Sequence, residues 1–102
     1  MTDRELLELA AKAAGYLTPS WYDSEAYIDG MLSMWNPLTD DRDAFMLIVK
    51  LGLVVNVWRD ANKVYAGNCD GDGAAENLLS DPYAATRRAT TRAAAEIGRQ
   101  MK

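Results

Sequence analysis

The feature that most restricts the fold is the stretch from Trp35 to Gly52, where a proline, a group of acids and a long apolar run follow one another. Proline cannot donate to a strand ladder, so Pro37 predicts the end of an extended segment. Thr39 or Asp40 then offers the side-chain oxygen that caps a helix N-terminus. The stretch therefore predicts a strand end followed by a helix that begins near residue 40.

The helix predicted from residue 40 is apolar over nearly its whole surface. Between Ala44 and Leu51 only Lys50 is polar, and a helix of this composition is buried on more than one side. We therefore expect it to be the central helix of the core and to end at Gly52.

A second helix is predicted at the N-terminus, over residues 3–14. Thr2 and Glu5 have the spacing of a capping box, in which each side chain bonds the backbone N–H of the other residue. An apolar stripe follows, and Gly15 is suited to a C-terminal stop.

The third predicted helix covers residues 82–100, after a capping Asp81 and a proline at the first helical position. Its many alanines give high helix propensity but little side-chain volume. We therefore expect this helix to lie close against the sheet, with bulk supplied by Tyr83, Ile97 and Met101.

The first predicted hairpin follows an irregular, aromatic-rich connector at residues 16–24. Its strands cover residues 25–28 and 31–35 and are joined by Asp-Gly, which favours a type I′ turn. This pairing sets Ile28 opposite Met31. The second strand lacks β-branched residues and suits a helical turn equally well.

The second predicted hairpin contains the strongest strand signal in the chain, the valine-rich residues 53–58. Residues 60–62 form its turn and residues 63–66 the returning strand. Residues 67–73 are expected to form a flexible loop, since glycine and short polar residues dominate them.

The predicted order of elements is α-β-β-α-β-β-α, in one α+β domain that spans residues 1–102. Two hairpins most simply build one antiparallel sheet of four strands, covered by the helices. A chain of 102 residues is long enough to bury a core of this kind.

The composition excludes several classes of function. The chain has no histidine, so it lacks the usual general base, the usual zinc ligand and the histidine of a serine or cysteine triad. Its single cysteine, Cys69, cannot form an internal disulfide, which fits a reducing cytoplasm. No apolar run has the length of a membrane span, and the charged N-terminus is unlike a signal peptide. The sequence predicts a cytoplasmic protein that is not an enzyme and holds no cofactor.

Two acidic motifs contain the residue types of a metal site. Residues 68–73 match the opening of a calcium-binding loop, but Leu79 stands at the twelfth position, where a bidentate glutamate belongs. Asp40, Asp41 and Asp43 crowd a helix N-terminus, where the helix dipole accounts for them. No metal site is predicted, and weak divalent binding at residues 68–73 is the alternative.

Charge is divided unevenly along the chain, whose net charge is −4. Residues 1–81 hold 14 acids and 6 bases, whereas residues 82–102 hold 5 bases and 1 acid. Arg88, Arg92 and Arg99 lie close to one face of the last predicted helix, so this face is a candidate contact for phosphate or for an acidic partner. Bases also complement the dipole near a helix C-terminus, which is the alternative explanation.

Aromatic side chains form a second candidate contact. Trp21, Tyr22 and Tyr16 fall in the irregular connector, and aromatic residues are enriched among the anchors of protein interfaces. The alternative role for these side chains is core packing. Trp21 and Tyr22, together with the three arginines of the last helix, are the predicted partner-binding residues.

Four segments of the chain form a pattern: residues 1–15, residues 35–41 (Trp-Asn-Pro-Leu-Thr-Asp-Asp), residues 49–51 (Val-Lys-Leu), and residues 84–89 (Ala-Ala-Thr-Arg-Arg-Ala) with residues 92–98 (Arg-Ala-Ala-Ala-Glu-Ile-Gly). These segments resemble small uncharacterised proteins of tailed bacteriophages and prophages. The chain departs from the pattern at Arg42, where glycine is expected, and in segments 16–34 and 53–80. The resemblance implies a phage or prophage origin and action inside a bacterial cell, and it brings no catalytic motif.

Phages carry many small acidic proteins that bind host proteins, and some of these block defence systems. By analogy, the resemblance implies an interaction protein that binds a protein of the bacterial host, with segments 16–34 and 59–80 as the partner-facing surface. The alternative is a nucleic-acid-associated factor that uses the basic last helix, although a pI of about 4.7 is unlike that of a dedicated nucleic-acid binder. The sequence leaves the oligomeric state open.

Overall fold

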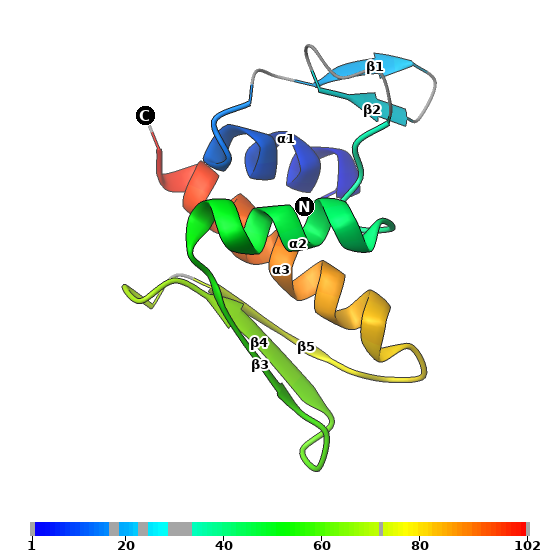
Figure 1. Cartoon of the computed structure of the whole chain (residues 1–102), viewed down its shortest axis with the longest axis vertical. Helices are drawn as coiled ribbons and strands as arrows, with labels where there is room; N and C mark the ends of the chain where they lie inside the picture. The colour runs from blue at the N-terminus through cyan, green and yellow to red at the C-terminus, as the bar shows by residue number, and fades with distance from the viewer. Residues whose placement is uncertain (1, 17–18, 23–24, 29–33, 72, 102) are drawn as a thin grey trace.

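The computed structural model describes residues 2–16, 19–22, 25–28, 34–71 and 73–101. This part of the chain forms three helices and two antiparallel sheets, which confirms the α+β class (Figure 1). The elements, in chain order, are α1 (Asp3–Ala13), β1 (Ser20–Tyr22), β2 (Glu25–Tyr27), α2 (Asp41–Leu51), β3 (Val54–Trp58), β4 (Lys63–Gly67), β5 (Gly73–Asn77) and α3 (Pro82–Gln100).

Helix α3 is the centre of the molecule. It contacts α1, α2, β4 and β5, and Figure 1 shows it running behind α2 from the lower right to the C-terminus. Its buried residues are all short, as predicted for close packing: Ala89, Thr90, Thr91, Ala93, Ala94, Ala95 and Gly98. The contact with α1 is tightest at Gly98, where an added Cβ would clash with the carbonyl oxygen of Leu9.

The expected bulk under α3 comes from its neighbours and not from α3 itself. Tyr83 and Met101 are exposed, so the prediction that they fill this space is wrong. Ile97 does pack against the core. Because the helix offers alanine, the large buried side chains belong to the elements that face it, such as Leu7 of α1 and Val64 of β4.

The prediction that α2 is the central helix, buried on more than one side, is wrong. Its buried residues are Asp43, Ala44 and Leu47, whereas Phe45 and Val49 are 63% and 65% exposed. Apolar composition shows which helix faces are able to be buried, but the number of elements packed around the helix decides which faces are.

The residues that precede α2 begin the helix as predicted. Trp35 is buried in the core, and the carboxylate of Asp40 caps α2 by accepting two backbone N–H groups at 2.8 and 3.2 Å. The carboxylate of Asp43 turns back and accepts the Asn36 N–H at 2.9 Å. Burial raises the pKa of Asp43 above its ordinary value, although that hydrogen bond lowers it. The helix ends at Gly52, whose positive φ of 63° suits a glycine stop.

Strands β3, β4 and β5 form a sheet in that order, so β3 and β5 are its two edges. The register pairs Val57 with Val64 and Val64 with Glu76. Opposed residues share one face of a sheet, and this row faces the helices because Val64 is fully buried. The neighbouring row, which contains Asn56 and Tyr65, faces the other way.

One hydrogen bond just past the ends of β4 and β5 shows in which direction the backbone N–H and C=O groups of this sheet point. The Leu78 N–H donates to the Asn62 carbonyl at 3.0 Å, which continues the pairing of β5 with β4. Backbone groups alternate in direction along an antiparallel strand, so Val64 bonds towards β5 and Tyr65 towards β3. The N–H and C=O groups of Val55 and Val57, opposite even-numbered β4 residues, therefore point out of the sheet at the β3 edge.

Strands β3 and β4 confirm the second predicted hairpin, but the expected single four-stranded sheet is wrong. The third strand is β5, where no strand was predicted because Gly-Ala-Ala-Glu-Asn contains no β-branched or aromatic residue. Its small residues serve packing: Ala74 is buried in the layer beneath α3, and at Gly73 an added Cβ would clash with the Ala66 carbonyl. Tertiary fit outweighs strand propensity here.

The remaining two strands form a separate sheet, in which Trp21 of β1 pairs with Ala26 of β2. The expectation of an irregular connector is therefore wrong at residues 20–22. Pro19 stands just before the strand, where its missing N–H removes no ladder bond.

Strand β2 confirms the strand predicted at residues 25–28, and it also pairs with β1, where no strand was predicted. The predicted turn, most of the returning strand and hence the pairing with Met31 fall on residues 29–33, which lie outside the described part. Met34, at the end of that segment, forms a bridge with Tyr27.

None of the helices in the described part of the chain combines the length and the apolar composition that crossing a bilayer requires.

Candidate protein-binding surface

The three arginines predicted to contact a partner are held by acids of the same chain. The pairs are Arg88 with Asp3 at 3.2 Å, Arg92 with Glu76, and Arg99 with Glu96. The hydrogen bond that Arg99 donates raises the pKa of its guanidinium. These partly exposed pairs add little to stability, but they compensate the positive charge that made this helix face a candidate phosphate contact.

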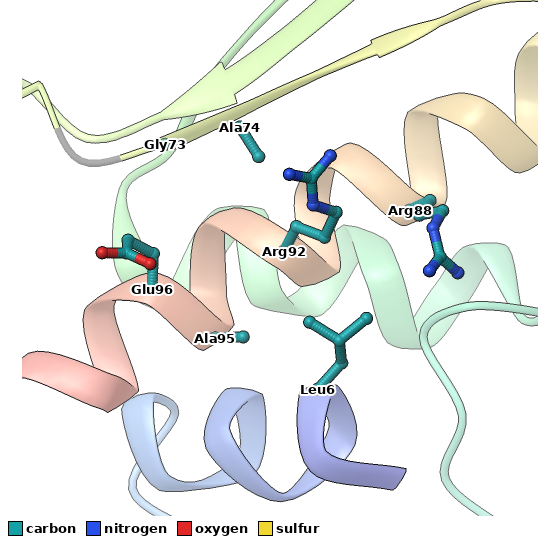
Figure 2. Close-up of a pocket in the computed structure, with 7 residues that line it drawn as sticks. All are labelled: Leu6, Gly73, Ala74, Arg88, Arg92, Ala95 and Glu96. Atoms are coloured by element: carbon teal, nitrogen blue, oxygen red, sulfur yellow. The ribbon is translucent and has the colours of Figure 1, made fainter. Parts of the chain in front are cut away.

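A cavity of about 230 Å³ lies beside two of these arginines, between α1, α3 and the start of β5 (Figure 2). Arg88 and Arg92 extend from α3 on one side, and Leu6 faces them from α1. Glu96 also lines the cavity, and both arginines already bind carboxylates. An anion would have to compete with these internal partners, so the charges present do not build an anion site.

Of the two aromatic side chains predicted to bind a partner, the structure describes that of Trp21. Trp21 is half-buried against the core, and the guanidinium of Arg4 lies 4.6 Å from its ring centroid. Its Nε1 is buried and has no hydrogen-bond acceptor among the described residues. The side chain of Tyr22 lies outside the described part. The predicted residues are thus spread over β1 and α3 and do not form one site.

Side-chain oxygens of the two acidic motifs accept hydrogen bonds from nearby backbone N–H groups. Asp40 and Asp43 accept N–H groups around the start of α2, and Asn68 accepts the Asp70 N–H at 3.1 Å in a tight turn. Among the residues that the structure describes, no group of three or more acids or cysteines is placed to hold a metal ion. Asp72 lies outside them.

An apolar surface that sequence reasoning did not single out extends over α2 and β3. Phe45 and Val49 of α2 are more than half exposed, Tyr83 of α3 is 73% exposed, and Val57 of β3 is 47% exposed. We use the name α2–β3 surface for these four residues. Val54 and Trp58 are also exposed, but they belong to the row of β3 that faces away from the helices. Contiguous exposed apolar patches of several large side chains mark interaction sites more often than scattered ones do.

A groove of about 360 Å³ crosses the α2–β3 surface. Phe45 and Ile48 of α2 form one wall, Tyr83 and Thr90 of α3 the other, and Val57 lines it from β3. Its volume is at the lower end of the range for pockets that hold a ligand. Val57 belongs to the row of β3 that faces the helices. The groove therefore lies on the helix side of the β3 edge, next to the outward-pointing N–H and C=O groups.

One end of the groove is fixed by Arg87. Its Nε donates to the Leu38 carbonyl at 3.0 Å, and its guanidinium binds Asp41 at 2.7 Å. The first residue of α2 and the loop before it are thereby attached to α3. This attachment holds the two walls of the groove at a defined separation.

The bases near this surface differ from those on α3. Arg42, Arg59 and Lys63 are exposed and form no ion pair within 4 Å in the described structure. Arg59 lines the groove. With Asp60 in the same hairpin, the residues around the β3 edge keep a net positive charge in a chain whose total is −4.

Comparison of the chain with protein-family models, with curated proteins and with solved structures finds no match. The site therefore has to be read from its own geometry. One sequence signal did point to it: the two most apolar segments, α2 and β3, follow each other directly across Gly52. Sequence alone could not show that each keeps one side uncovered.

Proposed function

We propose that this chain acts by binding another protein through the α2–β3 surface. The observation that carries the proposal is the groove and its apolar lining, where Phe45, Val57 and Tyr83 are each about half exposed or more. Large aromatic side chains beside a groove are the usual anchors of a protein interface. Burying them against a partner would remove apolar area that now faces water.

The resemblance to phage and prophage proteins supplies the setting of the proposal. It favours a partner in the bacterial host, and a host defence protein is the more specific form of the proposal. The partner-facing surface differs from the one expected in segments 16–34 and 59–80. Among the described residues of those segments, only Arg59 lines the groove.

The nucleic-acid alternative has less support from the geometry. Phosphate binding needs bases that are free to exchange counterions for phosphate, and Arg88, Arg92 and Arg99 are each bound to a carboxylate. Arg59, which has no ion pair among the described residues, lies instead beside an apolar groove, and such a setting suits a protein surface better than a phosphate backbone.

The test is affinity capture from a bacterial host lysate with two matched variants. One carries Phe45→Ser and Tyr83→Ser in the α2–β3 surface, where both side chains line the groove; the other carries Arg99→Ala on α3. We expect a protein that is enriched by the wild type and by Arg99→Ala, and lost with the double variant, while circular dichroism shows all three folded. If no captured protein depends on Phe45 and Tyr83, this surface is not the binding site.

A further inference from the structure

We propose that the partner binds by adding a strand to the open edge of β3, and that it supplies an extended segment with alternating apolar residues and an acidic residue near its end. This inference rests on the proposed function and names the chemistry of the partner at the same surface. It follows from three features that meet at the edge: free backbone groups, a groove and unpaired positive charge.

The outer edge of β3 has backbone groups that another strand can bond. The N–H and C=O groups of Val55 and Val57 point away from β4, and no described residue bonds to them. An exposed strand edge is a template for another strand, and main-chain bonds supply much of the affinity when a peptide joins a sheet. Five consecutive uncharged residues, Val54 to Trp58, offer nothing that repels a neighbouring strand.

The groove gives the added strand its selectivity. Alternate side chains of a strand beside β3 would point towards the helices, as those of Val55 and Val57 do. On that side they meet Phe45 and Ile48 of α2, where the groove is open. The edge thus selects an extended backbone, and the groove selects apolar side chains at every second position.

Charge restricts the occupant further. Arg59 follows β3 directly and lines the groove, and Lys63 begins the next strand. Neither has an acidic partner within the described structure. An acidic residue in the added segment would pair with Arg59, whereas the β3 strand of a second copy of this chain carries no acid. The charges therefore favour an acidic segment of another protein over self-pairing.

The experiment uses a displayed library of random ten-residue peptides, panned against the immobilised full chain. We expect enriched peptides to alternate apolar with polar residues and to carry aspartate or glutamate near one end. The best peptide is then measured by calorimetry against three variants: Val57→Pro, Val57→Ala and Arg59→Glu. Circular dichroism establishes that each variant is folded.

Each variant isolates one feature of the edge. Val57→Pro removes an outward N–H and should weaken binding about tenfold, since a hydrogen bond contributes up to about 1.4 kcal/mol. Val57→Ala keeps the N–H and removes only groove contact, so it should weaken binding less than Val57→Pro. Arg59→Glu should reverse the preferred charge of the enriched peptides from acidic to basic.

Several results would overturn the proposal. They are failure to enrich any peptide, enrichment of apolar residues at helical spacing, and full binding by Val57→Pro. A dimer of the chain in light scattering that Val57→Pro dissociates would also overturn it, because a second copy would then occupy the edge. A captured protein that depends on Phe45 and Tyr83 but tolerates Val57→Pro would retain the proposed function and reject strand addition.

Discussion

The two edges of the three-stranded sheet are built in opposite ways. At the β5 edge, Arg92 of α3 donates to the Ala75 carbonyl at 3.1 Å and pairs with Glu76. At the β3 edge, the outward groups of Val55 and Val57 have no such partner among the described residues. Proteins protect sheet edges with charged side chains and bulky neighbours. One edge of this sheet is protected and the other is left able to pair.

The contrast between the protected β5 edge and the open β3 edge points to the β3 edge as the functional one. Both edges belong to one short sheet, and α3 packs against β4 and β5. An unprotected apolar edge carries a risk of aggregation. We infer that such an edge is kept because something else covers it when the protein works.

The largest expected effect is a difference in stability between two proline variants of β3, one at an N–H that bonds to β4 and one at an N–H that points outward. By the alternation, the Asn56 N–H bonds to β4, whereas the Val57 N–H points outward. Asn56→Pro removes a ladder bond and leaves its acceptor on β4 unpaired, so it should lower the free energy of unfolding by about 2 kcal/mol. Val57→Pro should lower it by less than about 1 kcal/mol, since proline is tolerated at a solvent-facing edge position. Urea denaturation of both variants measures the contrast, and equal losses would show that the edge is assigned wrongly.

A second prediction removes the protection of the β5 edge. Arg92→Ala frees the Ala75 carbonyl and leaves the half-buried Glu76 without its base. The loss should be about 1 kcal/mol in a thermal or chemical melt, and light scattering should show concentration-dependent association. Arg99→Ala removes another surface pair from the same helix and serves as the control. If both variants behave alike, Arg92 does not protect the edge.

The third prediction concerns the helix beside the open edge. Phe45 and Val49 are mostly exposed, so Phe45→Ser and Val49→Ser should each change the free energy of unfolding by at most about 0.5 kcal/mol. Peptide binding at the groove should nevertheless fall for Phe45→Ser, because Phe45 forms one wall. Denaturation and calorimetry on the same samples test this separation. A large loss of stability would show that this face of α2 is already covered.

Much of the fold could be read from local signals in the sequence. The capping box at Thr2, the capping Asp40 and the Asp81-Pro82 start each mark a helix end that the structure confirms. The valine-rich β3 and its partner β4 were equally clear. These signals are local because a cap or a strand propensity acts within a few residues.

What the sequence did not supply depends on contacts between distant segments. The burial of α2 on one side and the ion pair between Arg92 and Glu76 depend on contacts between separate elements. The candidate site is of the same kind. It consists of faces that no other described element covers, and composition alone does not distinguish such a face from a buried one.

The smallest expected effect tests what holds α2 beside the β3 edge. Asp43 lies on the buried side of α2, and burial raises its pKa above the ordinary value. The folded protein therefore holds this proton more tightly than the unfolded chain, so its contribution to stability is greatest below the ordinary aspartate pKa. That contribution is lost as the pH rises through the raised pKa and is constant above it.

Asp43→Asn removes this titration but keeps an oxygen that can accept the Asn36 N–H. The free energy of unfolding of the wild type minus that of the variant should therefore fall as the pH rises from the ordinary aspartate pKa through the raised one. Chemical denaturation at a series of pH values measures this difference. A difference that rises over the same range would mean that the hydrogen bond from Asn36 and the charge of Arg42, which both lower the pKa, outweigh burial. In that case the charged carboxylate, and not burial beside the core, would be what fixes the start of α2.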